Sequence, residues 1–239
     1  MNYKYVILDF GKVLAGPTTG EWFITPKFKK LVDMSLIDIE KLNKAFDKHD
    51  EIISRRMNTE EEEYHNFYEL YSLVLQEVYL KYTDDIAHSI AYNFAYKSDK
   101  YTFYDNVKDE LEKLSKKYKL LLLTDNWPSV ERILKENKLY KYFDKIYISS
   151  QYGSIKKEGI FFDYLLDDYN IKKGDALFID DSIENLDVAV EKGLDVLLMD
   201  RDNNIECDNC EEIDFGACGA TKIKKNDLKN QYYNLLGKD

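Results

Sequence analysis

Four polar positions of the chain share one feature, because each comes directly after a short apolar run. The positions are Asp9, Thr124, Ser149 and Asp180, which follow the runs 5–8, 120–123, 146–148 and 176–179. A carboxylate at the end of a buried strand is costly to hold ionised unless a cation or hydrogen bonds compensate it. Asp181 directly follows Asp180, so this pair and Asp9 would bring three repelling acids together. A hard divalent cation, Mg²⁺ above all, relieves that repulsion and also binds phosphate oxygens.

A hydroxyl group and a positive charge would complete such a site. Thr124 supplies the hydroxyl, and Lys156 or Lys157 supplies the cation. Hydrogen-bond donors and cations of this kind stabilise the charge on phosphoryl oxygens. For Ser149 the expected role is hydrogen bonding to the backbone at a strand end. The residue types therefore predict a site for a metal and for phosphoryl oxygens.

The elements that must position these residues are the strands of a parallel sheet. The apolar runs show no alternation of polar and apolar residues, which is typical of strands buried on both faces. Helical patterns lie between the runs, one over residues 107–114 and another from Ser182 to Gly193. Strands that alternate with helices indicate a doubly wound α/β sheet, whose working site lies beyond the carboxyl ends of the strands.

Residues 15–98 interrupt this alternation with helical patterns of their own. Within them, Thr59 to Glu62 has the form of a capping box, and an apolar helical stripe runs from Tyr64 to Val78. We therefore expect an all-helical subdomain inserted after the first strand. The predicted division is an α/β core of residues 1–14 and 99–201, a helical insert of residues 15–98, and a C-terminal extension of residues 202–239 packed on the core.

Charge and composition narrow the classes of function. The chain has 239 residues, and 45 acidic against 34 basic side chains give a formal net charge of −11. This balance argues against nucleic acid or an anionic membrane as the main partner, because those partners attract basic surfaces. The apolar runs are far shorter than the roughly 18 residues that a membrane span needs. Since the sequence also begins without an apolar leader, we expect a cytoplasmic protein.

Three cysteines, Cys207, Cys210 and Cys218, lie close together near the end of the sequence. An odd number of cysteines cannot all pair within one chain. A zinc site would need a fourth ligand, and no histidine follows His88. We expect free thiols, and the sequence leaves metal binding by these cysteines open.

Taken in order, four motifs resemble those of the haloacid dehalogenase superfamily of aspartate-nucleophile hydrolases. The motifs are Asp9-Phe10-Gly11-Lys12-Val13-Leu14, Thr124-Asp125-Asn126, Ser149 through Gly153 to Lys156-Lys157-Glu158, and Asp180-Asp181-Ser182 with Asn185. The resemblance covers about residues 3–201 and places the helical insert where that family has its small cap. It implies a Rossmann-like core and a phosphatase-like branch whose first motif has the form Asp-x-Gly-x-Val.

The resemblance implies a role for each matching residue. Asp9 would be the nucleophile, Thr124 with the backbone amide of Asp125 would bind the transferring phosphoryl group, and Lys156 would neutralise the developing charge. The metal ligands would be the Asp9 carboxylate, the Gly11 backbone carbonyl and Asp181, with Asp180 as a further ligand or as a partner behind them. The expected substrate contacts are Asp125, Asn126 and Trp22. Trp22 and Phe23 are candidates for a substrate wall on the side of the insert, and they are equally suited to anchor the inserted helices.

Gly11 departs from the family pattern. An aspartate at this position, two residues after the nucleophile, normally protonates the leaving group and then activates the water that releases phosphate. Loss of a general acid and base lowers the reaction rate by about 10²- to 10⁴-fold. Some phosphatase branches of the superfamily share the Asp-x-Gly-x-Val form, so the prediction of a phosphatase stands. Asp125 is a candidate replacement acid.

We therefore expect a Mg²⁺-dependent phosphatase that hydrolyses a small phosphomonoester, a sugar phosphate or similar metabolite, through an aspartyl-phosphate intermediate. Two alternatives stay open. One is a carbon–halogen hydrolase of the same superfamily, which needs no metal, and the other is a non-catalytic relative that binds or senses a phosphorylated ligand. The expected partner is a small phosphorylated metabolite, with no nucleic acid and no membrane, and the expected state is a monomer or homodimer.

Overall fold

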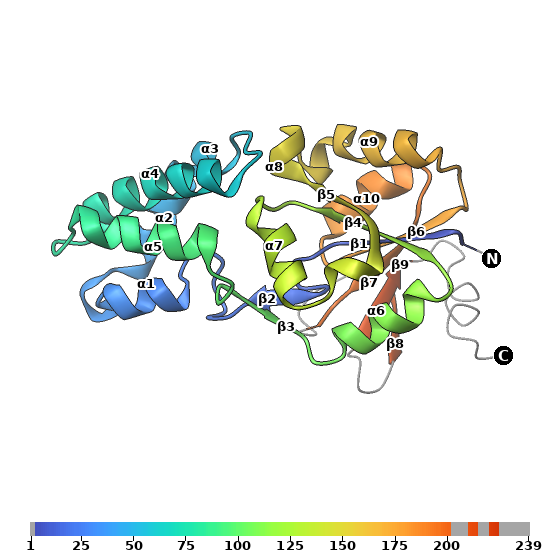
Figure 1. Cartoon of the computed structure of the whole chain (residues 1–239), viewed down its shortest axis with the longest axis horizontal. Coiled ribbons are helices and arrows are strands. Elements are labelled where there is room, and N and C mark those ends of the chain that lie inside the picture. Colours follow the sequence, from blue (N-terminus) through green and yellow to red (C-terminus); the bar gives the residue numbers. More distant parts are fainter. Residues whose placement is uncertain (1–2, 202–209, 215–219, 225–239) are drawn as a thin grey trace.

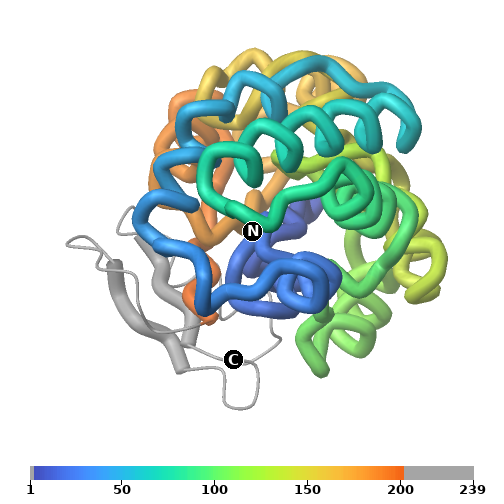
Figure 2. Tube along the Cα trace, turned by 90° about the vertical axis from the view of Figure 1, so that its left-hand side faces the viewer, coloured from blue at the N-terminus to red at the C-terminus, as the bar shows by residue number. Residues whose placement is uncertain are grey.

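The computed structural model describes residues 3–201, 210–214 and 220–224, the last two segments by their backbone alone. It consists of an α/β part built around one sheet and of a group of helices that extends from one end of that part (Figure 1). Viewed from that end, the inserted helices lie in front of the sheet (Figure 2). The cysteine side chains and most of the predicted C-terminal extension lie outside what the structure describes.

The central sheet has seven strands in the order β5-β4-β1-β6-β7-β9-β8. The strands are β1 (Tyr5–Leu8), β4 (Lys119–Thr124), β5 (Phe143–Ile148), β6 (Ala176–Asp180), β7 (Asp195–Met199), β8 (Cys210–Asp214) and β9 (Ala220–Lys224). The first five named are parallel, which confirms the predicted fold class. Strands β8 and β9, which the sequence analysis did not predict, extend the sheet beyond β7 in antiparallel fashion.

Helices cover both faces of the sheet, as its uninterrupted apolar strands require. On β1, Val6 and Leu8 pack in one apolar cluster with α6 (Val107–Ser115) and α7 (Ser129–Glu136). Ile7 points to the other face, where its cluster includes residues of α9 (Ile160–Tyr169) and α10 (Ile183–Glu191). The short elements of this part are η2 (Tyr140–Tyr142), α8 (Ser149–Tyr152) and η3 (Lys156–Glu158).

The inserted helices form a core of their own. They are α1 (Pro26–Leu31), η1 (Met34–Leu36), α2 (Ile39–Lys48), α3 (Asp50–Ile53), α4 (Glu60–Val78) and α5 (Asp84–Tyr96). The predicted capping box is confirmed. The Thr59 side chain accepts from the amide of Glu62, and the Glu62 side chain accepts from the amide of Thr59. Phe67 of α4 and Phe94 of α5 stack with ring centroids 3.8 Å apart inside a separate apolar cluster.

Two chain crossings join the insert to the α/β part. They form a short antiparallel pair, β2 (Ala15–Pro17) with β3 (Tyr101–Phe103). The domain limits expected from the sequence stay a prediction. None of the helices within the described residues is both long and apolar enough to cross a membrane.

Candidate active site

Strand register places the predicted acids next to one another. Leu8 pairs with Leu122 on one side and with Ile179 on the other. The backbone amide of Asp9 donates to the carbonyl of Ile179 at 2.9 Å, so the chain continues side by side into Asp9 and Asp180. The carboxyl ends of β1, β4 and β6 therefore meet at one edge of the sheet, where doubly wound folds hold their ligands.

The three acids form a compact cluster of oxygen donors. One carboxylate oxygen each from Asp9, Asp180 and Asp181 lies within 4.8 Å of the others. Asp9 and Asp180 are buried, and Asp181 is partly exposed. Hard divalent cations prefer oxygen ligands, and three carboxylates without a cation repel one another. This donor set fits Mg²⁺.

Lys156 is the positive charge inside the cluster. Its Nζ atom lies 2.7 Å from Asp9 Oδ1 and 2.5 Å from Asp180 Oδ2, and its side chain is 2% exposed. Burial alone would lower the pKa of Lys156, but the carboxylates of Asp180, Asp9 and Asp125 outweigh it and raise the pKa. Lys157 is exposed, so the structure places Lys156 and not its neighbour in the cluster.

Asp180 and Asp181 differ in how much of their hydrogen-bonding capacity is already used. Asp180 accepts bonds from Lys156 Nζ, from the amide of Ser182 at 2.8 Å and from Asn185 Nδ2 at 3.2 and 3.3 Å. Asp181 borders the cavity described below and lies 3.8 Å from Lys12 Nζ. Asp181 is therefore the more accessible of the pair, while Asp180 orients Lys156 and Asn185.

Burial makes two of these carboxyls hold their protons more tightly. It raises the pKa of Asp9 to about 7; Lys156 opposes this shift and the Asp180 carboxylate adds to it. Burial and the neighbouring Asp180 raise the pKa of Asp181 to about 6. A bound cation would favour the ionised form of both groups, so proton release and metal binding are coupled at this site.

The loop that follows β4 is held in place by hydrogen bonds from other segments. The amide of Asn126 donates to Ser149 Oγ at 3.1 Å, which agrees with the backbone-bonding role expected for Ser149. The Asn126 side-chain oxygen accepts from Tyr101 OH at 3.1 Å and from the amide of Trp127 at 2.9 Å. Asp125 Oδ1 accepts from the amide of Lys156 at 3.1 Å. These bonds hold the loop of residues 125–127 next to Lys156.

A cavity of about 330 Å³ opens above the cluster. Seven of its lining residues were expected at the site: Asp9, Gly11, Trp22, Asp125, Asn126, Lys156 and Asp181. Phe23 also lines the cavity, and it was expected beside Trp22 as part of a substrate wall or as an anchor for the inserted helices. Four others were not expected: Lys12, Tyr101, Trp127 and Asn185. Thr124 and Asp180 are buried at the ends of β4 and β6 and are not among the residues that line the cavity.

Trp22 fills the space beside Gly11. A Cβ atom added to Gly11 would lie 3.1 Å from Cη2 of the Trp22 indole and 3.5 Å from Asp9 Oδ2. The indole in turn packs edge-on against Tyr101, with ring centroids 5.9 Å apart. Trp22 and Tyr101 therefore form an aromatic wall beside Gly11, where the resemblance would place a second aspartate.

The unexpected lining residues differ in whether the sequence could have revealed them. Lys12 and Asn185 lie inside the first and fourth motifs, so the sequence was sufficient to predict that they lie near the site. Tyr101 and Trp127 belong to no motif. They meet only because the insert leaves after β2 and returns at β3 beside the loop that follows β4.

Comparison with known proteins points to one family. The sequence model of the haloacid dehalogenase-like hydrolases matches residues 23–199. A D-ribitol-5-phosphate phosphatase from Bacteroides thetaiotaomicron is 30% identical over an 89-residue alignment that covers 34% of this chain and 43% of that protein. The chain thus aligns with less than half the length of this curated relative.

Solved structures share the fold over 85% to 99% of the chain. A HAD family enzyme from Bacteroides thetaiotaomicron has a TM-score of 0.62 at 21% identity, covering 85% of this chain and 97% of its own. The same enzyme, in complex with magnesium and inorganic phosphate, gives 0.59 at 23% identity, with coverages of 86% and 98%. The YfnB protein from Bacillus subtilis, bound to magnesium, gives 0.62 at 16% identity and covers 99% of each chain.

Proposed function

Because the chain belongs to the haloacid dehalogenase-like hydrolase family, we propose that it is a Mg²⁺-dependent phosphatase acting on a small phosphomonoester. The observation that carries the proposal is the buried Lys156 ammonium between Asp9 and Asp180, with Asp181 beside them at the cavity. This arrangement offers a nucleophile, a cation for phosphoryl oxygens and a set of metal donors in one place. The ribitol-phosphate phosphatase among the relatives supports a phosphorylated sugar or polyol as substrate.

Asp9 is the nucleophile in this proposal. One of its carboxylate oxygens attacks phosphorus, the bond between phosphorus and the ester oxygen breaks, and the phosphoryl group stays on Asp9 as an aspartyl-phosphate. Water then attacks the phosphorus, the bond to Asp9 breaks, and inorganic phosphate leaves. Lys156 neutralises the carboxylate and the transferring oxygens, and Thr124 with the Asp125 amide donates hydrogen bonds to them.

The proposed metal donors are the Asp9 carboxylate, the Gly11 carbonyl and Asp181, with Asp180 held behind them by its own hydrogen bonds. When bound, Mg²⁺ offsets the negative charge of the acids and of the phosphoryl oxygens. Magnesium in two structures of the same fold supports this choice of cofactor. Asp125, Asn126 and Trp22 border the cavity and are the proposed substrate contacts.

Residue 11 cannot supply the proton that the leaving group needs. Gly11 offers no acid, and a Cβ atom at this position would already lie 3.1 Å from the Trp22 indole. The departing ester oxygen therefore takes its proton from water in the cavity or from Asp125, which lines it. Aryl and acyl phosphates, whose leaving groups need less protonation, should react faster than alkyl phosphates.

The test is Mg²⁺-dependent phosphate release from a panel of sugar, polyol and aryl phosphates, with wild type beside Asp9→Asn. Release that needs both the metal and Asp9 supports the phosphatase, and unchanged release from Asp9→Asn contradicts the mechanism. Chloride release from 2-haloacids without Mg²⁺ would instead identify a dehalogenase. Tight binding of a phosphate ester without turnover would identify a non-catalytic binding protein, the alternative that Gly11 keeps open.

A further inference from the structure

A fully buried ion pair joins the helical insert to the α/β part. Glu63 Oε1 lies 3.0 Å from Lys100 Nζ, and neither side chain has any exposed surface. Lys100 Nζ also lies 3.8 Å from the centre of the Phe94 ring. Burial lowers the pKa of Lys100, and Glu63 opposes that shift. Because a buried charge is costly without its partner, neither residue is replaceable alone without a penalty.

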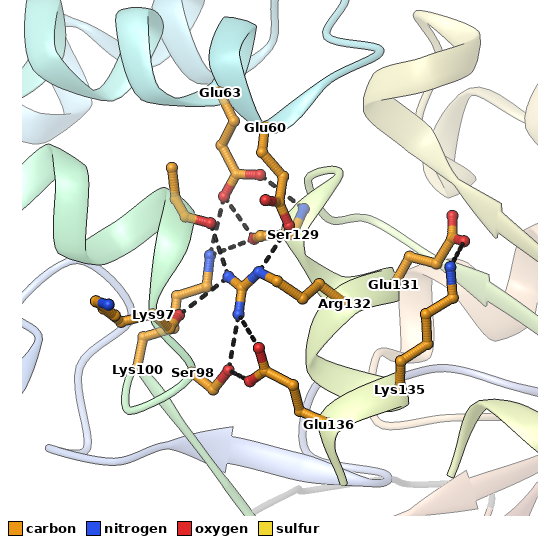
Figure 3. Close-up of polar contacts among 11 residues, drawn as sticks. Glu60, Glu63, Lys97, Ser98, Lys100, Ser129, Glu131, Arg132, Lys135 and Glu136 are labelled. Carbon is orange, nitrogen blue, oxygen red and sulfur yellow. Dashed lines mark hydrogen bonds and ion pairs between the residues drawn. The ribbon is translucent and has the colours of Figure 1, made fainter. Parts of the chain in front are cut away.

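The third member of this cluster is Ser129, the first residue of α7 (Figure 3). Glu63 Oε2 accepts from the Ser129 amide at 2.8 Å, and Glu63 Oε1 accepts from Ser129 Oγ at 2.6 Å. Lys100 Nζ donates to Ser129 Oγ at 2.8 Å. The cluster thus ties together α4, the segment before β3 and the start of α7, three segments far apart in the sequence.

Glu63 supplies the side-chain acceptor for the first amide of helix α7, while the amides of Val130 and Glu131 bond to the carbonyls of Trp127 and Pro128. The residue before Ser129 is Pro128, whose side chain cannot accept a hydrogen bond, and α7 has no side-chain cap of its own. The first amides of a helix need acceptors, and a negative charge there also complements the helix dipole. Glu63 supplies both from the insert.

The capped end of α7 is also the end of the loop that borders the cavity. Residues 125–127 line the cavity and are held between the end of β4 and Ser129. Tyr101 OH bonds Asn126 of this loop, and the adjacent Lys100 bonds Ser129. Two neighbouring residues of the segment that returns from the insert therefore hold the loop at two points.

We propose that Glu63 is a positioning residue for phosphoryl transfer. By capping α7 from the insert, it fixes the loop of residues 125–128, so that the loop's donors are aligned only while the insert is docked. The proposal rests on the function proposed above, because the loop's donors act on a phosphoryl group. Small misplacements of such donors are costly, up to about 100-fold in rate for a shift of roughly 1 Å.

A neighbouring contact provides a matched control. Glu60 lies on the same helix as Glu63 and pairs with Arg132 of α7 at 2.8 Å. Both of these side chains are partly exposed, at 27% and 23%. Glu60 therefore spans the same interface as Glu63, but it accepts a hydrogen bond from the Arg132 side chain, one turn along α7, and not from the capped amide (Figure 3).

The first experiment compares Glu63→Gln with Glu60→Gln in phosphate release. We expect kcat to fall by up to about 100-fold in Glu63→Gln, since the misaligned donors act on charge that develops in the transition state. Glu60→Gln should retain the wild-type kcat and KM. A Glu63→Gln enzyme with the kinetics of Glu60→Gln would overturn the proposal.

A double variant separates positioning from stability. Glu63→Met with Lys100→Met replaces the pair by apolar side chains of similar length, which for buried ion pairs is often neutral or stabilising. We expect it to unfold at a higher temperature than Glu63→Gln while its kcat stays low, because methionine offers the Ser129 amide no oxygen acceptor. Recovery of kcat together with stability would show that Glu63 is only structural.

A fluorescence measurement tests the same idea without turnover. The sequence has two tryptophans, so in a Trp22→Phe background the signal comes from Trp127 in the loop. Adding Glu63→Gln should increase quenching of Trp127 by acrylamide, and adding Glu60→Gln should not. If no phosphate ester is hydrolysed, the proposed function fails while this result still stands. Equal quenching in both variants would overturn the positioning role by itself.

Discussion

At the scale of single residues, Lys156 has the most direct effect on the acid cluster. Lys156→Met would keep the volume of the side chain but leave Asp9 and Asp180 buried without their shared cation. Breaking a buried pair in this way costs about 3–5 kcal/mol. We expect a loss of that order in the free energy of unfolding without Mg²⁺, measured by urea denaturation, and partial recovery when Mg²⁺ is added. The exposed neighbour gives the control, because Lys157→Met should unfold like wild type. Equal stability of the two variants would contradict the assigned contact.

The pairing of Gly11 with Trp22 leads to a second prediction. Gly11 does not have a positive φ, so any penalty for a side chain there comes from crowding and charge, and not from the backbone. Gly11→Asp would press its Cβ against the indole and add a carboxylate near Asp9. Overpacking of this kind costs about 1–3 kcal/mol. In a Trp22→Ala background the same substitution should cost less, with a coupling of about 0.5–3 kcal/mol in a double-mutant cycle. Additive effects of the two substitutions would contradict the contact.

At the scale of elements, the register of β1 and β6 makes metal binding depend on pH. The raised pKa values of Asp9 and Asp181 mean that the folded protein binds more protons than the unfolded chain between about pH 4 and pH 7. Stability contributed by these groups without metal therefore falls as the pH rises through that window. Mg²⁺ needs the ionised carboxylates, so its effect on the unfolding temperature should grow from pH 5 to pH 8. In Asp9→Asn this growth should be smaller. A Mg²⁺ effect that is the same at both pH values would contradict the raised pKa values.

The sequence predicted correctly those elements whose pattern lies within a short stretch of the chain. The apolar runs before Asp9, Thr124 and Asp180 identified three central strands, and their parallel order placed the acids at one edge. Strands β2 and β3, of three residues each, are too short to give a period. The aromatic wall could not be predicted, because Trp22 and Tyr101 meet across the whole length of the insert. Glu63 carried no signal either, since within the acidic run 60–63 it looks like an ordinary first-turn acid.

At the scale of the whole molecule, the insert and the α/β part have separate apolar clusters. Phe94 belongs to the cluster of the insert, and Phe178 belongs to the cluster between the sheet and helices α9 and α10. Both side chains are fully buried. Replacing either by alanine costs about 3–5 kcal/mol. We expect Phe94→Ala to speed hydrogen exchange in α4 and α5 while amides of β1, β4 and β6 stay protected, because opening can be confined to one cluster.

The buried contact between Glu63 and the start of α7 should couple the opening of the insert to that of the α/β part. Opening the insert would remove Glu63 from the Ser129 amide, so the first turn of α7 should lose protection together with α4 in Phe94→Ala. The matched variant Phe178→Ala should instead speed exchange in β6 and its neighbouring strands while α4 and α5 keep their protection. If Phe94→Ala exposed the sheet and the insert equally, the molecule would be a single cooperative unit. If it left the start of α7 protected, the cap from Glu63 would not hold that end of the helix, and the link between the insert and the cavity loop would have to lie elsewhere.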